Sequence, residues 1–181
     1  AVIADPDMLA RRAKQLGLDV TFVPVDAGAE LPMMQARQLA VIPVPMVEKE
    51  QPGLLNVANA SYVLETLKLA CDGCLSQRWQ GMVTAPVHKG IINDAGVAFS
   101  GHTEFLQERT GSEQVVMMLA TAGLRVALVT THLPLREVAD AITGERVKQI
   151  SRILYRSLQQ DFAVTQPRVL VCGLNPHAGE D

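Results

Sequence analysis

The alternation of short apolar runs with longer amphipathic segments is the feature that most constrains the fold of this chain. Short runs rich in β-branched residues are typical of strands, and apolar residues at helical spacing are typical of helices. The expected strands are residues 1–4, 20–23, 39–44, 81–85, 115–120, 125–130 and 168–173. The expected helices are residues 6–16, 56–70, 135–142 and 145–160. Strands that alternate with helices predict an α/β fold, with a mixed sheet flanked by helices.

Composition narrows the class of protein. The chain has 181 residues and a net charge of -3, and 4% of its residues are aromatic, which argues against a nucleic-acid partner. No apolar run approaches the roughly 20 residues of a membrane helix, and the first residues do not form a signal peptide. Three cysteines cannot all pair within the chain, so reduced thiols and a cytoplasmic location are expected.

Three of the four histidines follow expected strands. His88 comes after MVTA, His132 after VALVT and His177 after VLVCGLN. In open α/β sheets, ligands bind in the crevice outside the carboxyl ends of the strands. A single histidine is more often a packed or surface residue, but three at the end of one sheet favour a ligand site. A catalytic metal site takes about three protein ligands, and His132 with His177 would supply two.

Two further stretches are candidates for ligand binding. The segment PVHKGIINDAG contains Lys89, which could bind phosphate or transfer a proton, and the plain alternative is a solvated helix start. The segment FSGHTEF is expected to be a loop, in which His102 and Thr103 could hold a small polar or phosphorylated ligand.

The cysteines favour a structural reading. CDGC has the spacing of a metal or redox motif, but no second cysteine pair exists, and the motif closes a helix with Gly73 as the expected cap. Cys172 lies in an apolar run and is expected in the core. No GxGxxG or GxxxxGK[ST] pattern occurs, so no standard nucleotide-binding loop is expected.

Five motifs in order give the chain a family resemblance. TAPVHKGIINDAG, GHTEF, VVMMLAT, TTHLPL and VCGLNPHAGE together resemble the 4-hydroxythreonine-4-phosphate dehydrogenase family of vitamin B6 biosynthesis, which is related in fold to isocitrate and isopropylmalate dehydrogenases. The resemblance covers about the middle half of the family's length, without its GEPAGIGPE-like strand or its YHDQG-like segment. It implies parts of two α/β domains, residues 1–100 and 101–181, the second carrying the metal and substrate residues.

The resemblance also implies an activity. The family oxidises 4-phosphooxy-L-threonine to 2-amino-3-oxo-4-phosphooxybutanoate, which loses carbon dioxide to give 3-amino-2-oxopropyl phosphate on the route to pyridoxal 5'-phosphate. The reaction uses NAD or NADP and a divalent metal, which is zinc, magnesium or cobalt. The family works in the cytoplasm as a homodimer, with active sites near the subunit interface.

The resemblance assigns roles to individual residues. His102 and Thr103 are expected to bind substrate, and His132 and His177 to ligate the metal, whose third histidine would come from the YHDQG-like segment. The base that takes the hydroxyl proton stays open between Lys89 and a metal-bound hydroxide. The sequence identifies no cofactor-binding residue.

Three other functions compete with this reading. Relatives within the resemblance oxidise other phosphorylated hydroxy acids, such as four-carbon sugar acid phosphates, or dihydrodiol carboxylates. A metal-dependent hydrolase would use the histidine pair to activate water and would need no NAD. An inactive fragment would bind metal or phosphate without turnover.

Overall fold

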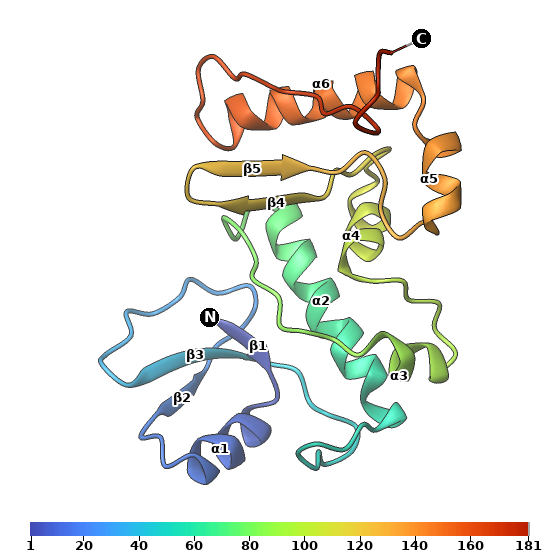
Figure 1. Ribbon diagram of the computed structural model, residues 1–181. Helices are drawn as coiled ribbons and strands as arrows, with labels where there is room; N and C mark the ends of the chain where they lie inside the picture. The colour runs from blue at the N-terminus through green and yellow to red at the C-terminus, as the bar shows by residue number, and fades with distance from the viewer. Residues whose placement is uncertain (181) are drawn as a thin grey trace. The chain divides into compact units, whose positions relative to one another are not determined.

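The structure is a computed structural model that describes residues 1–180. The chain forms two compact units, Ala1–Glu113 and Gln114–Asp181. Figure 1 shows the elements of both. The α/β class predicted from the sequence is confirmed. The division into domains near residue 100 stays a prediction.

The first unit is built on a three-stranded parallel sheet. Its strands are β1 (Val2–Ala4), β2 (Thr21–Pro24) and β3 (Gln38–Pro43), in the order β1-β3-β2. Helix α1 (Pro6–Gln15) connects β1 to β2, the two outer strands of the sheet, because strands that run parallel need a crossover connection. The central strand β3 is the most buried, and Val41 in it is fully inaccessible. These elements confirm the predicted alternation.

Asp5 joins three parts of the first unit. Its carboxylate accepts from Met8 N at 2.8 Å, which caps α1, and from Met46 N at 2.8 Å, in the loop after β3. Its own N–H donates to the Tyr62 hydroxyl at 3.2 Å. Burial alone would raise the pKa of Asp5, but the backbone N–H groups that bond the carboxylate outweigh it and lower the pKa. The charged form of Asp5 therefore stabilises the fold.

Helix α2 (Ala60–Leu75) follows the short helix η1 (Val57–Asn59) and packs against β1. It extends beyond the predicted end at residue 70, so the expectation that Gly73 caps the helix is wrong. Gly73 is buried inside it, and a Cβ there would lie 2.0 Å from the Trp79 ring. Because glycine has no side chain, the Trp79 ring can pack directly against the helix backbone at Gly73. Cys71 and Cys74 lie on the same helix and are free.

The first unit has two further helices, α3 (Lys89–Asp94) and α4 (His102–Thr110). The exposed start of α3 at Lys89 agrees with the solvated helix start given as the plain alternative for this segment, whereas α4 was not predicted. The expectation that His102 lies in a loop is therefore wrong, because His102 opens α4. Gly101 and Gly111 bound this helix, and an acidic residue in its first turn and a basic one in its last complement its dipole. The two glycines and these charged residues are features of the sequence that indicate a helix at this position.

The second unit pairs two strands and carries two helices. Strands β4 (Met118–Thr121) and β5 (Leu124–Ala127) form an antiparallel hairpin close to the predicted strands and turn. Helices α5 (Leu135–Ala141) and α6 (Gly144–Gln160) follow, both as predicted. Within residues 1–180, no helix combines the length and apolar character needed to cross a membrane.

Two predicted strands are not formed. Residues 81–85 and 168–173 belong to neither sheet, and Val83 and Leu170 are 101% and 93% exposed. A strand requires hydrogen bonds to a neighbouring strand, and within residues 1–180 neither segment has such a neighbour. The expectation that Cys172 is a core residue fails for the same reason, because Cys172 is exposed. A groove of about 620 Å³ lies beside residues 79–85, between them and residues of β1 and α2.

The role of Asp5 gives a test at acid pH. Asp5→Ala should lower the free energy of unfolding at pH 7 by about 1 kcal/mol or more, the usual cost of a lost helix cap. Because the folded-state pKa of Asp5 lies below its unfolded value of about 3.9, its contribution is complete above that pH and disappears as pH falls through the folded pKa. Urea unfolding between pH 7 and 2 measures both effects.

Asp7→Ala is the matched control, because Asp7 is exposed in the first turn of the same helix. Equal losses of stability in the two variants, or a loss for Asp5→Ala that does not change with pH, would contradict the role assigned to Asp5.

Candidate functional site

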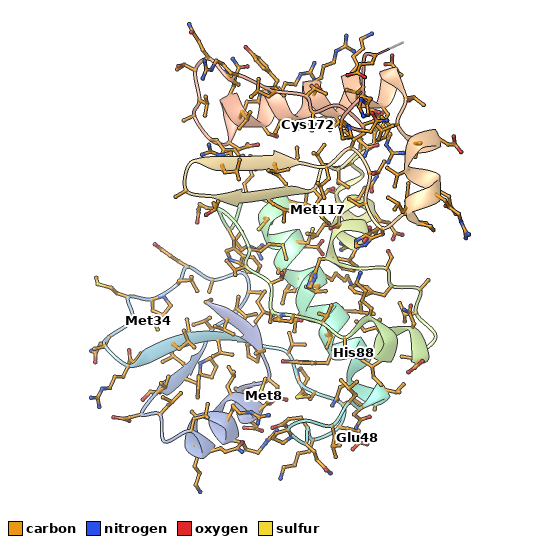
Figure 2. All side chains as sticks on the ribbon, viewed as in Figure 1. Met8, Met34, Glu48, His88, Met117 and Cys172 are labelled. Carbon is orange, nitrogen blue, oxygen red and sulfur yellow. The ribbon has the colours of Figure 1, made fainter. Side chains whose placement is uncertain are left out.

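His88 has a structural role at the start of α3. Its Nδ1 accepts a hydrogen bond from Ile91 N at 3.1 Å, which makes the exposed ring the N-cap of the helix. Figure 2 labels the residue next to α3. Since Nδ1 is occupied, only Nε2 is available to another partner.

Lys89 and Glu104 approach the same glycine. A Cβ built on Gly101 would lie 3.1 Å from Lys89 Nζ and 3.2 Å from Glu104 Oε2. Gly101 is buried, with a φ of 155°, a conformation that only glycine adopts readily. The structure therefore brings the Lys89 ammonium to the N-terminal end of α4, where His102 and Thr103 begin the helix.

His102 carries a buried nitrogen with no partner. Its ring meets the Phe99 ring edge-on, with centroids 6.4 Å apart and an interplanar angle of 77°. Among residues 1–180, Nε2 is inaccessible to solvent and makes no hydrogen bond. An unmet buried polar atom costs about 1–3 kcal/mol, which makes this nitrogen a candidate to bond a ligand. Thr103, next in the helix, is half-buried.

Helix α4 is fixed at both ends. Before its start, Phe99 is buried in an apolar cluster with Ala60, Leu67 and Ile92. Near its C-terminal end, Arg109 Nε donates to Asp72 Oδ1 of α2 at 2.7 Å, and a second nitrogen of Arg109 bonds Oδ2. Hydrogen bonding from this guanidinium lowers the pKa of Asp72. The CDGC segment thus contributes a contact that holds α4.

His132 has an unusual backbone conformation in the second unit. Its φ is 57°, in the left-handed region that residues other than glycine rarely occupy. It is exposed and follows β5 by a short connection. Arg146 of α6 donates from Nε to Val129 O at 3.0 Å and so holds that connection. Such backbone outliers gather at functional sites.

His177 is held by two polar neighbours. Its N–H donates to Asn175 Oδ1 at 2.9 Å, and its Nδ1 lies 2.8 Å from Glu180 Oε2. Because a carboxylate only accepts, Nδ1 carries a proton, and in the neutral imidazole Nε2 then has the free lone pair. Proteins commonly prepare a metal-binding histidine in this way.

The residues of the second unit fit a divalent metal by their chemistry but do not complete a centre. Imidazole nitrogens suit zinc and cobalt, and His132 and His177 offer two. Within residues 1–180, no three His, Cys, Asp or Glu side chains gather as a metal-binding group. The assignment of His132 and His177 as ligands stays a prediction, with a third ligand to come from elsewhere.

The structure thus places the predicted residues in two groups. Lys89, His102 and Thr103 lie together in the first unit, and His132 and His177 lie in the second. The expectation that the histidines end strands of one sheet is wrong, because His88 and His177 follow segments that are not strands.

Sequence reasoning missed two carboxylates beside these residues, Glu104 and Glu180. Each lies two or three positions after its histidine, in GHTE and NPHAGE. This short spacing between histidine and glutamate was the sequence signal that could have identified the two carboxylates.

Comparison with solved structures defines the class. The chain matches the 4-hydroxythreonine-4-phosphate dehydrogenase of Klebsiella pneumoniae with a TM-score of 0.86 at 28% identity, covering 99% of this chain and 55% of that one. It matches the enzyme of that name from Burkholderia phymatum with a TM-score of 0.84 at 29% identity, covering 99% and 54%. The fold is the α/β fold of these dehydrogenases, of the isocitrate dehydrogenase-like type.

Sequence comparison then gives the family. The model of the family described as pyridoxal phosphate biosynthetic protein PdxA matches residues 1–181, so the chain belongs to the PdxA family. It is 59% identical over 180 residues to a 4-hydroxythreonine-4-phosphate dehydrogenase of Pseudomonas putida, covering 98% of this chain and 54% of that protein. For the Vibrio cholerae protein of that name the identity is 53%, with coverage of 99% and 54%. The chain spans about half the length of these relatives.

Gly101 gives a test of the site's construction. Gly101→Ala should cost about 3 kcal/mol of unfolding free energy, because alanine strains the backbone and its Cβ crowds Lys89 and Glu104. Gly111→Ala is the control: it is also at positive φ, 64°, but no atom lies within 4 Å of its Cβ. It should cost about 1 kcal/mol. Urea unfolding compares the two, and equal costs would mean that Lys89 and Glu104 do not confine residue 101.

Proposed function

We propose that this chain is the part of a 4-hydroxythreonine-4-phosphate dehydrogenase that binds the phosphorylated substrate and supplies two metal ligands. The whole protein would oxidise 4-phosphooxy-L-threonine with NAD or NADP, and the product would lose carbon dioxide to give 3-amino-2-oxopropyl phosphate, in pyridoxal 5'-phosphate biosynthesis. Membership of the PdxA family supports this reaction. The observation that carries it is the buried Nε2 of His102, which has no partner within residues 1–180.

His102, Thr103 and Lys89 would receive the substrate. The His102 nitrogen and the Thr103 hydroxyl offer hydrogen bonds at the start of α4, where free backbone N–H groups and the helix dipole favour an anion. The Lys89 ammonium, next to Gly101, adds a positive charge there. Lys89 would either neutralise an anionic group of the substrate or, once deprotonated, accept the hydroxyl proton.

His132 and His177 would hold a divalent metal, with zinc, magnesium and cobalt as candidates. Glu180 would keep the His177 ring in the tautomer that leaves Nε2 free, and Asn175 would fix its backbone. When bound, the metal supplies a Lewis acid that acidifies the substrate hydroxyl and polarises the resulting ketone.

The remaining parts of the proposal concern the whole protein. NAD or NADP would accept the hydride, through residues not yet assigned. Two copies of the protein would form a homodimer in the cytoplasm, with the active sites near the subunit interface. A relative that oxidises another phosphorylated hydroxy acid is the nearest alternative, and substrate comparison in the same assay separates the two.

The test follows NADH absorbance with the full-length protein that contains this chain. Purified protein, 4-phosphooxy-L-threonine, NAD or NADP, and zinc, magnesium or cobalt should give steady production of reduced cofactor. His102→Ala should lower kcat/KM on the order of 100-fold, the effect of losing a hydrogen bond to a charged substrate group. His88→Asn is the control, because asparagine can still cap α3.

Three outcomes would contradict the proposal. No reduction of NAD or NADP by the wild type, with hydrolysis of a phosphate ester in its place, would indicate a hydrolase. Turnover only with a four-carbon sugar acid phosphate would indicate the related dehydrogenase. Equal losses of activity for His102→Ala and His88→Asn would remove the specific role of His102. The same assay on the 181-residue chain alone shows whether it is active or an inactive fragment.

Metal binding gives an independent prediction. Glu180→Gln should weaken zinc affinity about 10–100-fold, because the amide cannot hold the His177 tautomer as the carboxylate does. His132→Ala and His177→Ala should weaken it further. Competition with a chromophoric chelator measures the affinities, and Glu145→Gln, on the exposed side of α6, is the matched control. Unchanged zinc affinity in both histidine variants would exclude this pair as ligands.

A further inference from the structure

Asn93 makes two hydrogen bonds to the backbone of one residue. Its Nδ2 donates to Phe99 O at 3.1 Å, and Phe99 N donates to its Oδ1 at 2.8 Å. The side-chain amide therefore satisfies both polar groups of Phe99, as a neighbouring strand would. This pairing closes residues 94–98 into a loop and fixes the backbone of Phe99 relative to α3.

Phe99 passes this constraint to the substrate-binding candidates. Phe99 is 5% exposed, and its ring packs against Ile92 and Phe105, so the ring has little freedom to move. The same ring meets the ring of His102 edge-on. A shift of the Phe99 backbone would therefore move the surface against which His102 rests.

The connection between Phe99 and His102 is short and conformationally restricted. Only Ser100 and Gly101 separate them, and Gly101 has a φ of 155° with Lys89 and Glu104 beside it. The other attachment of α4, between Arg109 and Asp72, lies at the far end of the helix. The start of α4, with His102 and Thr103, is thus connected to Phe99, whose ring packs in the apolar cluster and whose backbone is hydrogen-bonded by Asn93.

We propose that Asn93 is a positioning residue that holds His102 and Thr103 in place for the substrate by fixing the backbone of Phe99. Asn93 touches no reacting group itself. The inference rests on the proposed function in one respect, the assignment of His102 and Thr103 to the substrate.

The first unit contains a matched control. Asn59 pairs in the same way with Glu48, whose N–H donates to Asn59 Oδ1 at 2.9 Å and whose carbonyl accepts from Nδ2 at 2.9 Å. Glu48, labelled in Figure 2, lies in the segment between β3 and η1, well separated in the chain from His102. Asn59 is 8% exposed, so its loss should cost at least as much stability as the loss of Asn93, which is exposed.

The experiment compares Asn93→Ala, Asn93→Asp and Asn59→Ala in the full-length protein. The NADH assay gives kcat and KM for the phosphorylated substrate and for NAD, and urea unfolding gives stability. Asn93→Ala should raise KM for the phosphorylated substrate on the order of tenfold, as expected for one displaced hydrogen bond, with a smaller change in kcat and none in the KM for NAD. Asn59→Ala should lower stability and leave these KM values unchanged.

A second measurement needs no activity. The NMR signals of the His102 ring, assigned by their loss in His102→Ala, depend on the neighbouring Phe99 ring. They should shift in Asn93→Ala and stay in place in Asn59→Ala. Asn93→Asp keeps the acceptor for Phe99 N and loses the donor, so its shift of the His102 signals should be intermediate. If Asn93→Ala does not fold, Asn93→Asp replaces it in this measurement.

The results separate this inference from the proposed function. A folded Asn93→Ala variant with unchanged His102 signals and unchanged KM would overturn the positioning role. Equal changes in Asn59→Ala would also overturn it, because they would show a general effect of lost stability. A wild-type protein without dehydrogenase activity would overturn the proposed function, while the NMR shifts would still decide whether Asn93 positions His102.

Discussion

The burial of four apolar side chains is the constraint on which the first unit and its candidate site depend. Ala60 and Leu67 come from α2, Ile92 from α3, and Phe99 from the segment before α4. A large apolar side chain gains about 1.5–3 kcal/mol on full burial, more than any exposed ion pair in the unit can supply. The cluster therefore sets where α3 and α4 lie, and Lys89 and His102 take their places at the starts of these helices.

The two groups of candidate residues are held by different forces. His102 rests on a packed ring and has a nitrogen removed from water. His177 and its partner Glu180 are 77% and 72% exposed in their side chains, so water competes for the bond between them. The first group is prepared by packing, whereas the second is prepared by hydrogen bonds and a left-handed turn at His132. A bound ligand would add more order to the second group than to the first.

The sequence predicted those features that depend on local pattern. Helix α1 has its cap at Asp5 and is followed by Gly17 at a φ of 65°, and the apolar spacing of α6 is plain, so both helices were found. Helix α4 was missed although Gly101 and Gly111 bound it, because no apolar periodicity accompanies them. Residues 81–85 and 168–173 have the composition of strands, but strand formation depends on a partner that the pattern cannot reveal.

The geometry of the site was less predictable than its residues. Local motifs indicated His102, Thr103, His132 and His177 as candidates for ligand binding, and the family resemblance assigned their roles, which stay predictions. The pairing of Asn93 with Phe99 could not be read from the sequence, since it depends on how the loop between them turns. The tautomer of His177 likewise follows from the place of Glu180.

The segments 81–85 and 168–173 have a consequence for how the polypeptide associates with other strands. Both present apolar side chains and backbone groups that no strand within residues 1–180 satisfies. Exposed extended segments of this kind pair readily with copies of themselves on other molecules. A strand from another part of a longer polypeptide, or from a partner molecule, that paired with either segment would cover these side chains and satisfy these backbone groups.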